Sequence, residues 1–239
     1  MGKVILVASG KGGTGKSTTT AALACGLAEL GHSVVCLDAD VELRNLDLCL
    51  GLSDSALMDY GDVLSGRCNL EDALTPSREF PTLSLLAAPV EPPMSGAEGL
   101  IPRLRATFDY CLLDCPGGLS TAARWASLSD LALIVATPDP CSQRDAARAA
   151  QALSREGLEK ARLIINRVSR RFLRSTAATL DDTIDLVGLQ LIGYVPEDPG
   201  VSLALAQGTP LLARSGKGAA AAFRRISRRL DGQHVPLRR

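Results

Sequence analysis

The feature that most constrains this chain is a glycine-rich run near its N-terminus. Residues 10–17 read Gly-Lys-Gly-Gly-Thr-Gly-Lys-Ser, directly after the apolar segment Lys3–Ala8 and at the start of a helix-like stretch, Lys16–Leu30. Glycines let the backbone curl so that successive N–H groups point to one place, and the following helix adds the partial positive charge of its N-terminus. A strand, a GxxxxGKS/T loop and a helix in this order predict a phosphate-binding loop in an α/β fold.

Beyond this loop, short runs rich in Val, Ile and Leu alternate with longer stretches of helical period. The alternation is typical of a mostly parallel, twisted sheet with helices on both faces, as in P-loop NTPases. The predicted strands are Lys3–Ala8, Ser33–Asp38, Leu83–Ala87, Tyr110–Asp114, Leu131–Thr137, Arg162–Asn166 and Leu191–Val195. The predicted helices are Lys16–Leu30, a piece near Ala56–Leu64, Gly99–Thr107, Ser142–Arg155, Thr179–Val187, Val201–Gln207 and Gly218–Leu230. Proline-rich segments on both sides of the strand at 83–87 are expected to be loops.

A length of 239 residues is enough for one large α/β domain, whereas two domains would each be small. We therefore expect a single domain over residues 1–239, with the last helix at about 218–230 and a short tail at 231–239. The 26 basic and 26 acidic residues give a formal charge of +0, so no field of the whole molecule attracts nucleic acid or an anionic membrane. Any contact with either must be local.

Seven cysteines occur without a CxxC pair or a nearby histidine cluster, which argues against a zinc site or a disulfide framework. Most lie in apolar runs, where a thiol packs as a small hydrophobic group, and this usage fits a reducing cytoplasm. The N-terminus has no signal-peptide pattern, and no apolar run approaches the roughly 20 residues needed to cross a bilayer. We expect a cytoplasmic protein.

Polar side chains in and beside the loop are the candidates for binding phosphate and Mg²⁺. Lys16 is expected to reach the β- and γ-phosphates of a nucleotide, and the Ser17 hydroxyl to ligate Mg²⁺. One predicted strand ends at Asp38, with Asp40 two residues later, and another ends at Asp114 in the position of a Walker B aspartate. We expect Asp114 to hold a Mg²⁺-bound water. Capping of a strand end is the alternative explanation for Asp38 and Asp40.

A second lysine in the loop, Lys11, gives the sequence KGGTGKS, which resembles the deviant Walker A loop of the MinD, ParA, NifH and arsenical-pump ATPases. The segments LDADVELRNLDLCLGL, DCPGGL, LIINR and LIGYVPED follow in the order of the MinD/ParA family, so the resemblance covers nearly the full chain. The second switch departs from the usual DSPAG-type sequence because Cys115 replaces a serine. A packed thiol is expected there, with a redox role as the alternative.

The resemblance implies an ATPase whose catalytic residues are Lys11, Lys16 and Asp40. In the family, the lysine matching Lys11 reaches the nucleotide of a second subunit, the residue matching Asp40 orients the attacking water, and Asp38 would help to hold Mg²⁺. The implied metal-site residues are Ser17, Asp38 and Asp114. The segments at 166–167 and 196–198 would frame adenine, and the guanine-specific NKxD signature is absent, so ATP is expected rather than GTP. The implied nucleotide-binding residues are Gly12, Gly13, Thr14, Gly15, Lys16, Ser17, Thr18, Asn166, Arg167, Pro196, Glu197 and Asp198.

The resemblance further implies an ATP-dependent homodimer, a spatial switch that helps to place the division septum. Partners resembling MinC and MinE would recognise the dimer surface. The alternative is a ParA-like or flagellar-placement ATPase that acts in DNA or cargo positioning through the arginine-rich last helix. Under the leading interpretation nucleic acid is not an expected partner. A metal-cluster carrier is disfavoured because such relatives use paired cysteines.

One departure concerns the C-terminus. Family members generally continue into an amphipathic membrane-targeting helix, whereas only Arg238 and Arg239 follow the VPL segment here. The apolar face of the last predicted helix consists of Ala219, Phe223, Ile226 and Leu230, and arginines occupy the other face. Such a helix either lies on anionic lipid or docks on its own sheet. Docking is favoured, with at most a weak peripheral contact at the inner face of the cell membrane.

Overall fold

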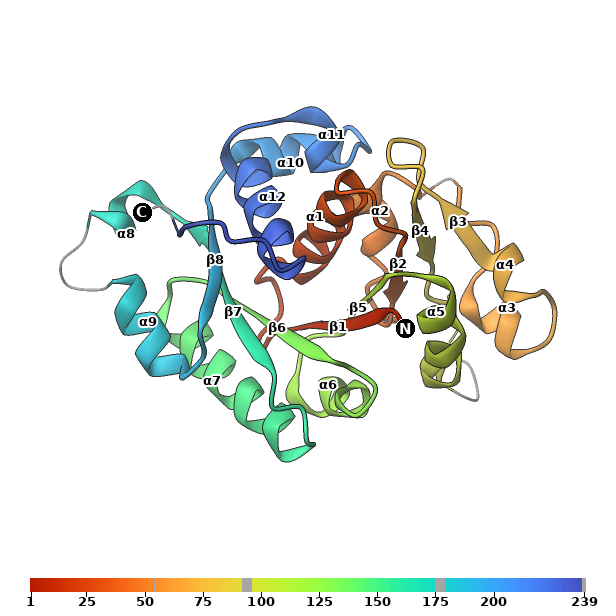
Figure 1. Cartoon of the computed structure of the whole chain (residues 1–239), viewed down its shortest axis with the longest axis horizontal. Helices are drawn as coiled ribbons and strands as arrows, with labels where there is room; N and C mark the ends of the chain where they lie inside the picture. Colours follow the sequence, from red (N-terminus) through yellow and green to blue (C-terminus); the bar gives the residue numbers. More distant parts are fainter. Residues whose placement is uncertain (54, 92–95, 175–178, 238–239) are drawn as a thin grey trace.

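The computed structural model describes residues 1–53, 55–91, 96–174 and 179–237 (Figure 1). Within them the chain forms a sheet of eight strands in the order β3-β4-β2-β5-β1-β6-β7-β8. The strands are β1 (Lys3–Ala8), β2 (Val34–Asp38), β3 (Leu74–Pro76), β4 (Leu83–Leu86), β5 (Tyr110–Asp114), β6 (Leu131–Ala136), β7 (Ala161–Val168) and β8 (Leu191–Pro196). All neighbouring strands are parallel except β3 and β4. The predicted α/β fold with a mostly parallel sheet is confirmed.

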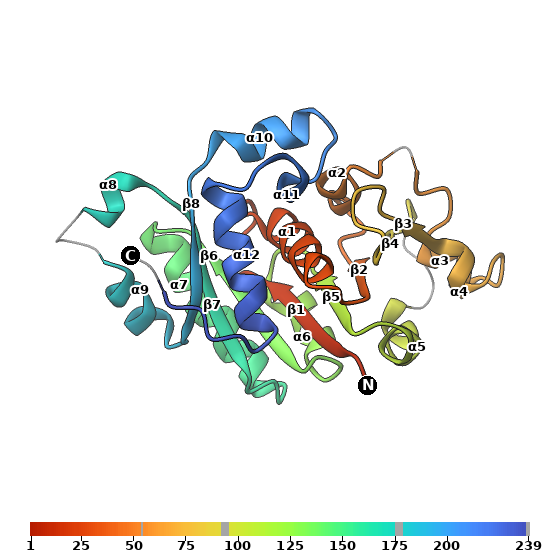
Figure 2. The same cartoon turned by 45° about the horizontal axis from the view of Figure 1, so that its top comes forward.

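Helices cover both faces of the sheet, as Figures 1 and 2 show. They are α1 (Lys16–Glu29), α2 (Leu46–Leu50), α3 (Tyr60–Leu64), α4 (Leu70–Ala73), α5 (Ile101–Thr107), α6 (Leu119–Ala126), α7 (Pro140–Arg155), α8 (Arg170–Leu173), α9 (Leu180–Val187), α10 (Pro199–Ala206), α11 (Leu211–Arg214) and α12 (Gly218–Leu230), with a 3₁₀ turn η1 (Ala97–Leu100) before α5. One face of the sheet carries α1, α2, α10, α11 and α12, and the other carries α5, α6, α7 and α9.

The central strand β1 explains this layering. Ile5 and Val7 pack into the apolar cluster under α1 and α12, whereas Val4, Leu6 and Ala8 pack into the cluster on the opposite face. Successive side chains of a strand point to opposite faces, so a strand with apolar side chains on both faces must be covered on both sides. The unbroken apolar runs of β1 and β6 are therefore a consequence of this three-layer arrangement.

The predicted bounds differ from the structure mainly at short elements. Helix α2 lies where no helix was predicted, and the amide of Leu46 at its start donates to Asp38 Oδ2 at 3.3 Å. The helical piece near Ala56–Leu64 begins only at Tyr60, because Asp59 caps it by accepting hydrogen bonds from the amides of Gly61 and Asp62. The prediction that only loops flank β4 is wrong, because β3 forms an antiparallel edge strand beside it. Helices α4, α6, α8 and α11 were also missed.

The C-terminal helix α12 has the predicted bounds and docks on the sheet. Its apolar face is buried against α1 and β8, so of the two alternatives for this helix the structure shows docking. Among the residues that the structure describes, no helix is both long and apolar enough to cross a bilayer. Arg238 and Arg239 lie outside the described residues.

Candidate nucleotide-binding site

The glycine-rich loop connects β1 to α1 at the carboxyl edge of the sheet. Gly13 and Gly15 have φ angles of 78° and 92°, which only glycine adopts without strain, so the loop curls before α1 begins. The two lysines of the loop have different surroundings. Lys16 is buried, with 8% of its surface exposed, whereas Lys11 is exposed. One lysine therefore belongs to the interior of the site and the other to its outer rim.

Two carboxylates lie side by side on neighbouring strands below this loop. Asp38 and Asp114 are register partners at the ends of β2 and β5, and only 2% and 1% of their surfaces are exposed. Asp38 accepts hydrogen bonds from the amides of Asp40 and Leu46, and Asp114 accepts one from the Thr20 hydroxyl at 3.1 Å. Burial, and after it the neighbouring Asp114, raises the pKa of Asp38 to about 7, while burial raises the pKa of Asp114 to about 6. The hydrogen bonds to Asp38, and those to Asp114 together with the charge of Lys16, offset only part of the effect of burial on these pKa values.

This donor set suits Mg²⁺. A hydrogen bond with Ser17 partly offsets the burial that raises the pKa of Asp114, so the Ser17 hydroxyl lies beside that carboxylate. Within the described ranges, no three acidic, histidine or cysteine side chains form a metal cage of their own. Mg²⁺ is typically held by one or two carboxylates together with waters and substrate phosphates, so two carboxylates and a hydroxyl beside a phosphate loop are an appropriate set.

A cavity of about 380 Å³ opens in front of the loop. Its lining consists of Gly12, Gly13, Gly15, Lys16, Ser17, Thr18, Asp40, Leu43, Asn45, Leu48, Cys49, Gly117, Arg167 and Leu205. Asp40 is buried beside it, and its Oδ1 accepts a hydrogen bond from the amide of Leu43 at 3.1 Å. A Cβ on Gly117 would lie 3.4 Å from Gly12 Cα and 3.5 Å from Lys16 Nζ, so the second switch approaches the loop closely.

A second cavity of about 430 Å³ adjoins the first, because Gly15, Thr18 and Arg167 line both. Its lining consists of Gly15, Thr18, Asn166, Arg167, Pro196, Glu197, Asp198, Pro199, Val201, Ser202 and Phe223. The segments predicted to frame a base are brought together here from the carboxyl ends of β7 and β8. Each cavity has a size typical of small-ligand pockets, and the pair forms a path from the phosphate loop to the predicted base pocket.

Asn166 joins the two cavities through its side-chain amide. Its Nδ2 donates to the Thr14 carbonyl at 2.8 Å, and its Oδ1 accepts from the amide of Arg167 at 2.9 Å. An asparagine amide has two donor hydrogens and two acceptor lone pairs, so each end keeps one further hydrogen-bonding position. The amide therefore holds the phosphate loop in place and can still contact a base.

The structure adds lining residues that sequence reasoning missed. Leu43, Asn45, Leu48 and Cys49 come from the region of α2, and Val201, Ser202 and Leu205 come from α10. Phe223 comes from α12, far from any motif, and nothing in the local sequence indicates its place in the site. Lys11 lines neither of the two cavities, so the loop motif alone does not bring it into its own subunit's site.

Cys115 follows Asp114 but faces the core. It is fully buried in the cluster under α6 and α7, and burial raises its thiol pKa well above the ordinary value. A protonated, enclosed thiol is a poor nucleophile. The predicted packed thiol is therefore what the structure shows.

Comparison with known proteins agrees with this geometry. Residues 5–211 match the family described as the CobQ/CobB/MinD/ParA nucleotide binding domain. The septum site-determining protein MinD of Synechocystis sp. is 37% identical over 245 residues, which cover 99% of this chain and 92% of that protein. For MinD of Helicobacter pylori the identity is 39% over 249 residues, covering 98% and 92%. This chain belongs to the MinD family.

Solved structures lead to the same family. A chain of the MinC:MinD cell division protein complex of Aquifex aeolicus is 34% identical and superposes with a TM-score of 0.91, covering 99% of this chain and 98% of that one. The Pyrococcus horikoshii MinD complexed with Mg-ADP is 30% identical with a TM-score of 0.85, covering 97% and 96%. The predicted membership of the MinD/ParA group is confirmed, and the chain is a septum site-determining ATPase of the MinD type.

Proposed function

We propose that this MinD-family ATPase binds Mg²⁺ and ATP in the two adjoining cavities, forms a homodimer around ATP, and releases it by hydrolysis to ADP and phosphate. The whole chain, residues 1–239, would act as one ATPase domain. The observation that carries the dimer proposal is the difference between the two loop lysines. Lys16 lines the phosphate cavity, whereas Lys11 is exposed and lines neither cavity. An exposed lysine at the rim would extend toward a nucleotide held by a second subunit.

The proposed roles follow from position and charge. The backbone amides of residues 12–18 and the Lys16 ammonium bind the triphosphate, and the start of α1 adds its partial positive charge. Ser17, Asp38 and Asp114 would hold Mg²⁺, which supplies charge compensation for the phosphates and for the two buried carboxylates. Asp40 lies in the same cavity as Lys16, and its carboxylate would orient the attacking water.

Lys11 of the partner would complete this site. A cation added from the second subunit stabilises the charge that develops on the transferred phosphoryl group, as an arginine finger does in other NTPases. Catalysis then depends on dimerisation, and nucleotide state is transmitted through assembly. In the second cavity, Asn166, Arg167, Pro196, Glu197 and Asp198 would surround adenine.

For partners, the neighbouring Aquifex aeolicus structure is a MinC:MinD complex. By that likeness, we propose that a MinC-like protein recognises the ATP-bound dimer of this chain and that a MinE-like protein stimulates its hydrolysis. Membrane contact would be weak and peripheral at the inner face of the cell membrane, because the apolar face of α12 is occupied by α1 and β8. Arg224 and Arg229 of the same helix are held by hydrogen bonds within the chain, so a DNA interface through this helix is not favoured.

The test is to compare Lys11→Ala with wild type by sedimentation velocity with ADP and with Mg·ATP, alongside ATP titration and turnover. We expect the wild type to dimerise only with ATP, and Lys11→Ala to bind ATP normally as a monomer and to lose turnover. Lys160→Ala, which removes another exposed lysine, is the matched control and should behave as wild type. A Lys11→Ala protein that still dimerises with ATP would contradict the proposed role.

A further inference from the structure

Most of the base cavity comes from one late segment of the chain. We name residues 196–223 the base-side cap; it runs from the end of β8 through α10 and α11 into α12. Seven of the eleven residues that line the base cavity belong to it, among them Asp198, Val201 and Phe223. The phosphate loop, in contrast, is part of the β1–α1 connection near the N-terminus. The distance between a bound base and its phosphates therefore depends on how the cap is fixed to α1.

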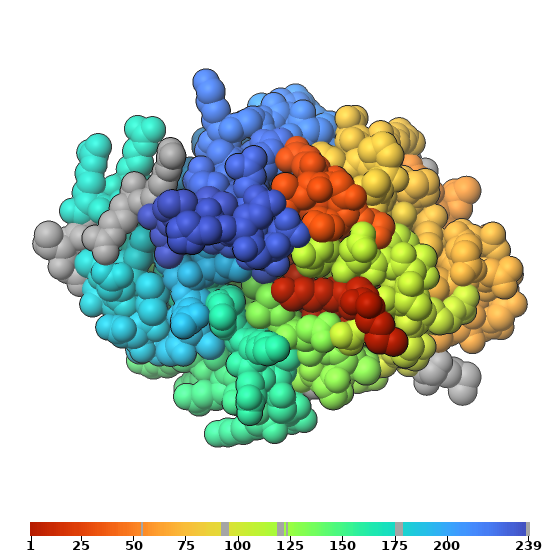
Figure 3. All heavy atoms as spheres, viewed as in Figure 1, coloured from red at the N-terminus to blue at the C-terminus, as the bar shows by residue number. Residues whose placement is uncertain are grey.

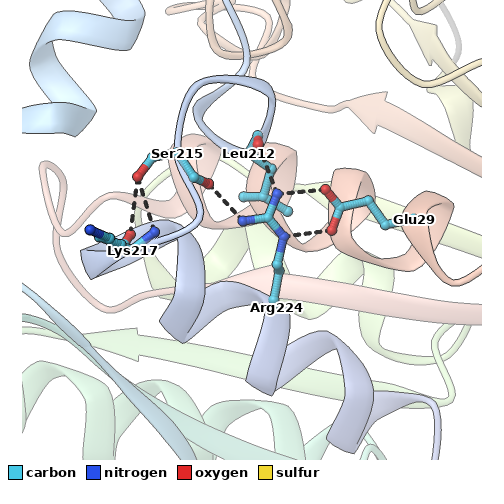
Figure 4. Close-up of polar contacts among 5 residues, drawn as sticks. All are labelled: Glu29, Leu212, Ser215, Lys217 and Arg224. Carbon is cyan, nitrogen blue, oxygen red and sulfur yellow. Dashed lines mark hydrogen bonds and ion pairs between the residues drawn. The ribbon is translucent and has the colours of Figure 1, made fainter.

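Arg224, directly after the cap, makes that connection. Its guanidinium donates to both carboxylate oxygens of Glu29, at the last residue of α1, with distances of 2.7 and 2.6 Å. It also donates to the carbonyl of Leu212 at 2.8 Å and to that of Ser215 at 2.6 Å (Figure 4). One side chain thus joins α1, α11, the following loop and α12. Such a bidentate, charge-assisted pair fixes direction as well as distance.

Two further contacts hold α12 between α1 and the base cavity. At the crossing of α1 and α12, a Cβ on Gly26 would meet Ser227 Oγ at 2.3 Å, and that hydroxyl donates to the Leu23 carbonyl at 3.2 Å. At the start of α12, the amide of Ala219 donates to Asp198 Oδ2 at 2.8 Å. Figure 3 shows the dark blue C-terminal segment lying directly beside the orange-red surface at the end of α1. The helix thus connects the end of α1 to the wall of the base cavity.

We propose that Arg224 is a positioning residue for nucleotide recognition: by locking the base-side cap to Glu29 of α1, it sets the base cavity at the correct distance from the phosphate loop. The inference rests on the proposed binding of ATP across the two cavities. The phosphate loop does not need this lock, because it is held by β1 on one side and by the Asn166 bond to the Thr14 carbonyl on the other. Breaking the lock therefore affects recognition of the base and leaves recognition of the phosphates nearly unchanged.

The experiment compares the binding of Mg·ATP with that of Mg·tripolyphosphate, which has the phosphates but no base, by isothermal titration calorimetry. The variants are Arg224→Ala, Arg224→Lys and Glu29→Gln, and the full chain is used throughout. For all three we expect the Kd for ATP to rise about tenfold and the Kd for tripolyphosphate to change less than about twofold. Arg224→Lys should not restore the affinity for ATP, because a lysine ammonium cannot form the two-pronged contact with the Glu29 carboxylate. Arg228→Ala, which removes an exposed arginine of the same helix, should match wild type in both titrations.

A purely structural role for Arg224 would weaken both ligands together, and that result would overturn the proposal. Unchanged binding of both ligands by Arg224→Ala and Glu29→Gln would also overturn it. Thermal unfolding of each variant shows whether the protein titrated is folded; if Arg224→Ala does not fold, Glu29→Gln and Arg224→Lys decide the question. A wild-type protein that binds neither ligand would instead refute the proposed ATP binding, so the two failures are distinguishable.

Discussion

The two halves of the site differ in how complete they are before any ligand binds. In the phosphate half, Asp38 and Asp114 are buried next to each other with raised pKa values, and the buried Thr14 hydroxyl has no hydrogen-bond partner among the residues that the structure describes. In the base half, the side chains of Asn166 and Asp198 are already hydrogen-bonded. The Asn166 amide bonds to backbone at both ends, and the Asp198 carboxylate accepts from the amides of Gly200 and Ala219.

This difference indicates a division of work between the halves. A buried charge that is not fully compensated lowers the free energy of unfolding. A bound ligand of opposite charge removes this destabilisation, so binding in the phosphate half couples to conformation. Paired polar groups fix a shape in advance, so the base half selects a ligand rather than responding to it. We therefore expect Asp38, Asp40 and Asp114 to respond to the nucleotide state, and the base-side cap to determine which base is bound.

The largest expected effect is a pH dependence caused by Asp38. A carboxyl whose folded pKa is raised from 3.8 to about 7 contributes stability that is fully present below pH 3.8 and is lost as the pH rises through about 7. Between pH 5 and 8 the ligand-free protein should lose on the order of 2 to 3 kcal/mol of unfolding free energy through this group, and Asp114 acts in the same direction. Urea denaturation in the presence of a chelator measures the loss.

Asp38→Asn is the matched variant for this measurement. The asparagine side chain is nearly isosteric but does not ionise, so the contribution of Asp38 to the pH dependence is removed. The loss of unfolding free energy between pH 5 and 8 should fall by roughly half or more. A wild-type stability that stays flat or rises over this range would mean that the two carboxylates are compensated, and the contrast between the halves would be lost.

The second prediction concerns Asn166, where the halves meet. Asn166→Ala leaves the Thr14 carbonyl and the Arg167 amide without their partner, so the phosphate loop loses a support. We expect the Kd for Mg·ATP and for Mg·tripolyphosphate to rise together, each by about tenfold. Calorimetric titration with both ligands measures this, and the joint rise would distinguish Asn166 from Arg224.

Asn166→Asp serves as the control for this prediction, since it keeps the oxygen that accepts from Arg167 but cannot donate to Thr14. It should weaken both ligands at least as much, because a carboxylate would face a carbonyl oxygen and the phosphates. If ATP alone were weakened by Asn166→Ala, then the amide would serve the base directly, and its role in holding the loop would be wrong.

In both halves, sequence reasoning predicted the lining residues that come from strand ends and the loop, and it missed those that come from the helices α2, α10 and α12. Strand ends and the loop place Lys16, Asp38 and Asp114 by local chain geometry, so their spacing in the sequence already indicates their positions. Arg224 bonds to Glu29, 195 residues away, and Phe223 lines the base cavity from α12; no local pattern reveals either placement. The buried strands were predicted almost residue by residue because burial on both faces demands continuous apolar runs.

Short helices were the weakest part of the prediction for a related reason. An element of four or five residues, such as α2 or α11, gains little from its own helical hydrogen bonds and forms because tertiary contacts hold it. The start of α2 depends on Leu46 donating to Asp38, a bond between two residues that carry no joint sequence signature. The lining residues that α2 contributes were missed together with the helix.

The smallest expected effect tests where the phosphate half ends. Cys115 is covalently next to Asp114, yet its fully buried side chain lies among apolar residues under α6 and α7 and belongs to the core rather than to the cavity. Cys115→Ser replaces a weakly polar thiol with a hydroxyl in this apolar setting, which should lower the unfolding free energy by about 1 kcal/mol. ATP turnover per folded molecule should stay within about twofold of wild type, because Cys115 is not among the residues that line the phosphate cavity. Urea denaturation and a phosphate-release assay give the two values, with the exposed Cys141→Ser as a control that should change neither. A Cys115→Ser protein with unchanged stability but little turnover would place the thiol in the chemistry, and the boundary between core and site would then have to be drawn one residue further along the chain.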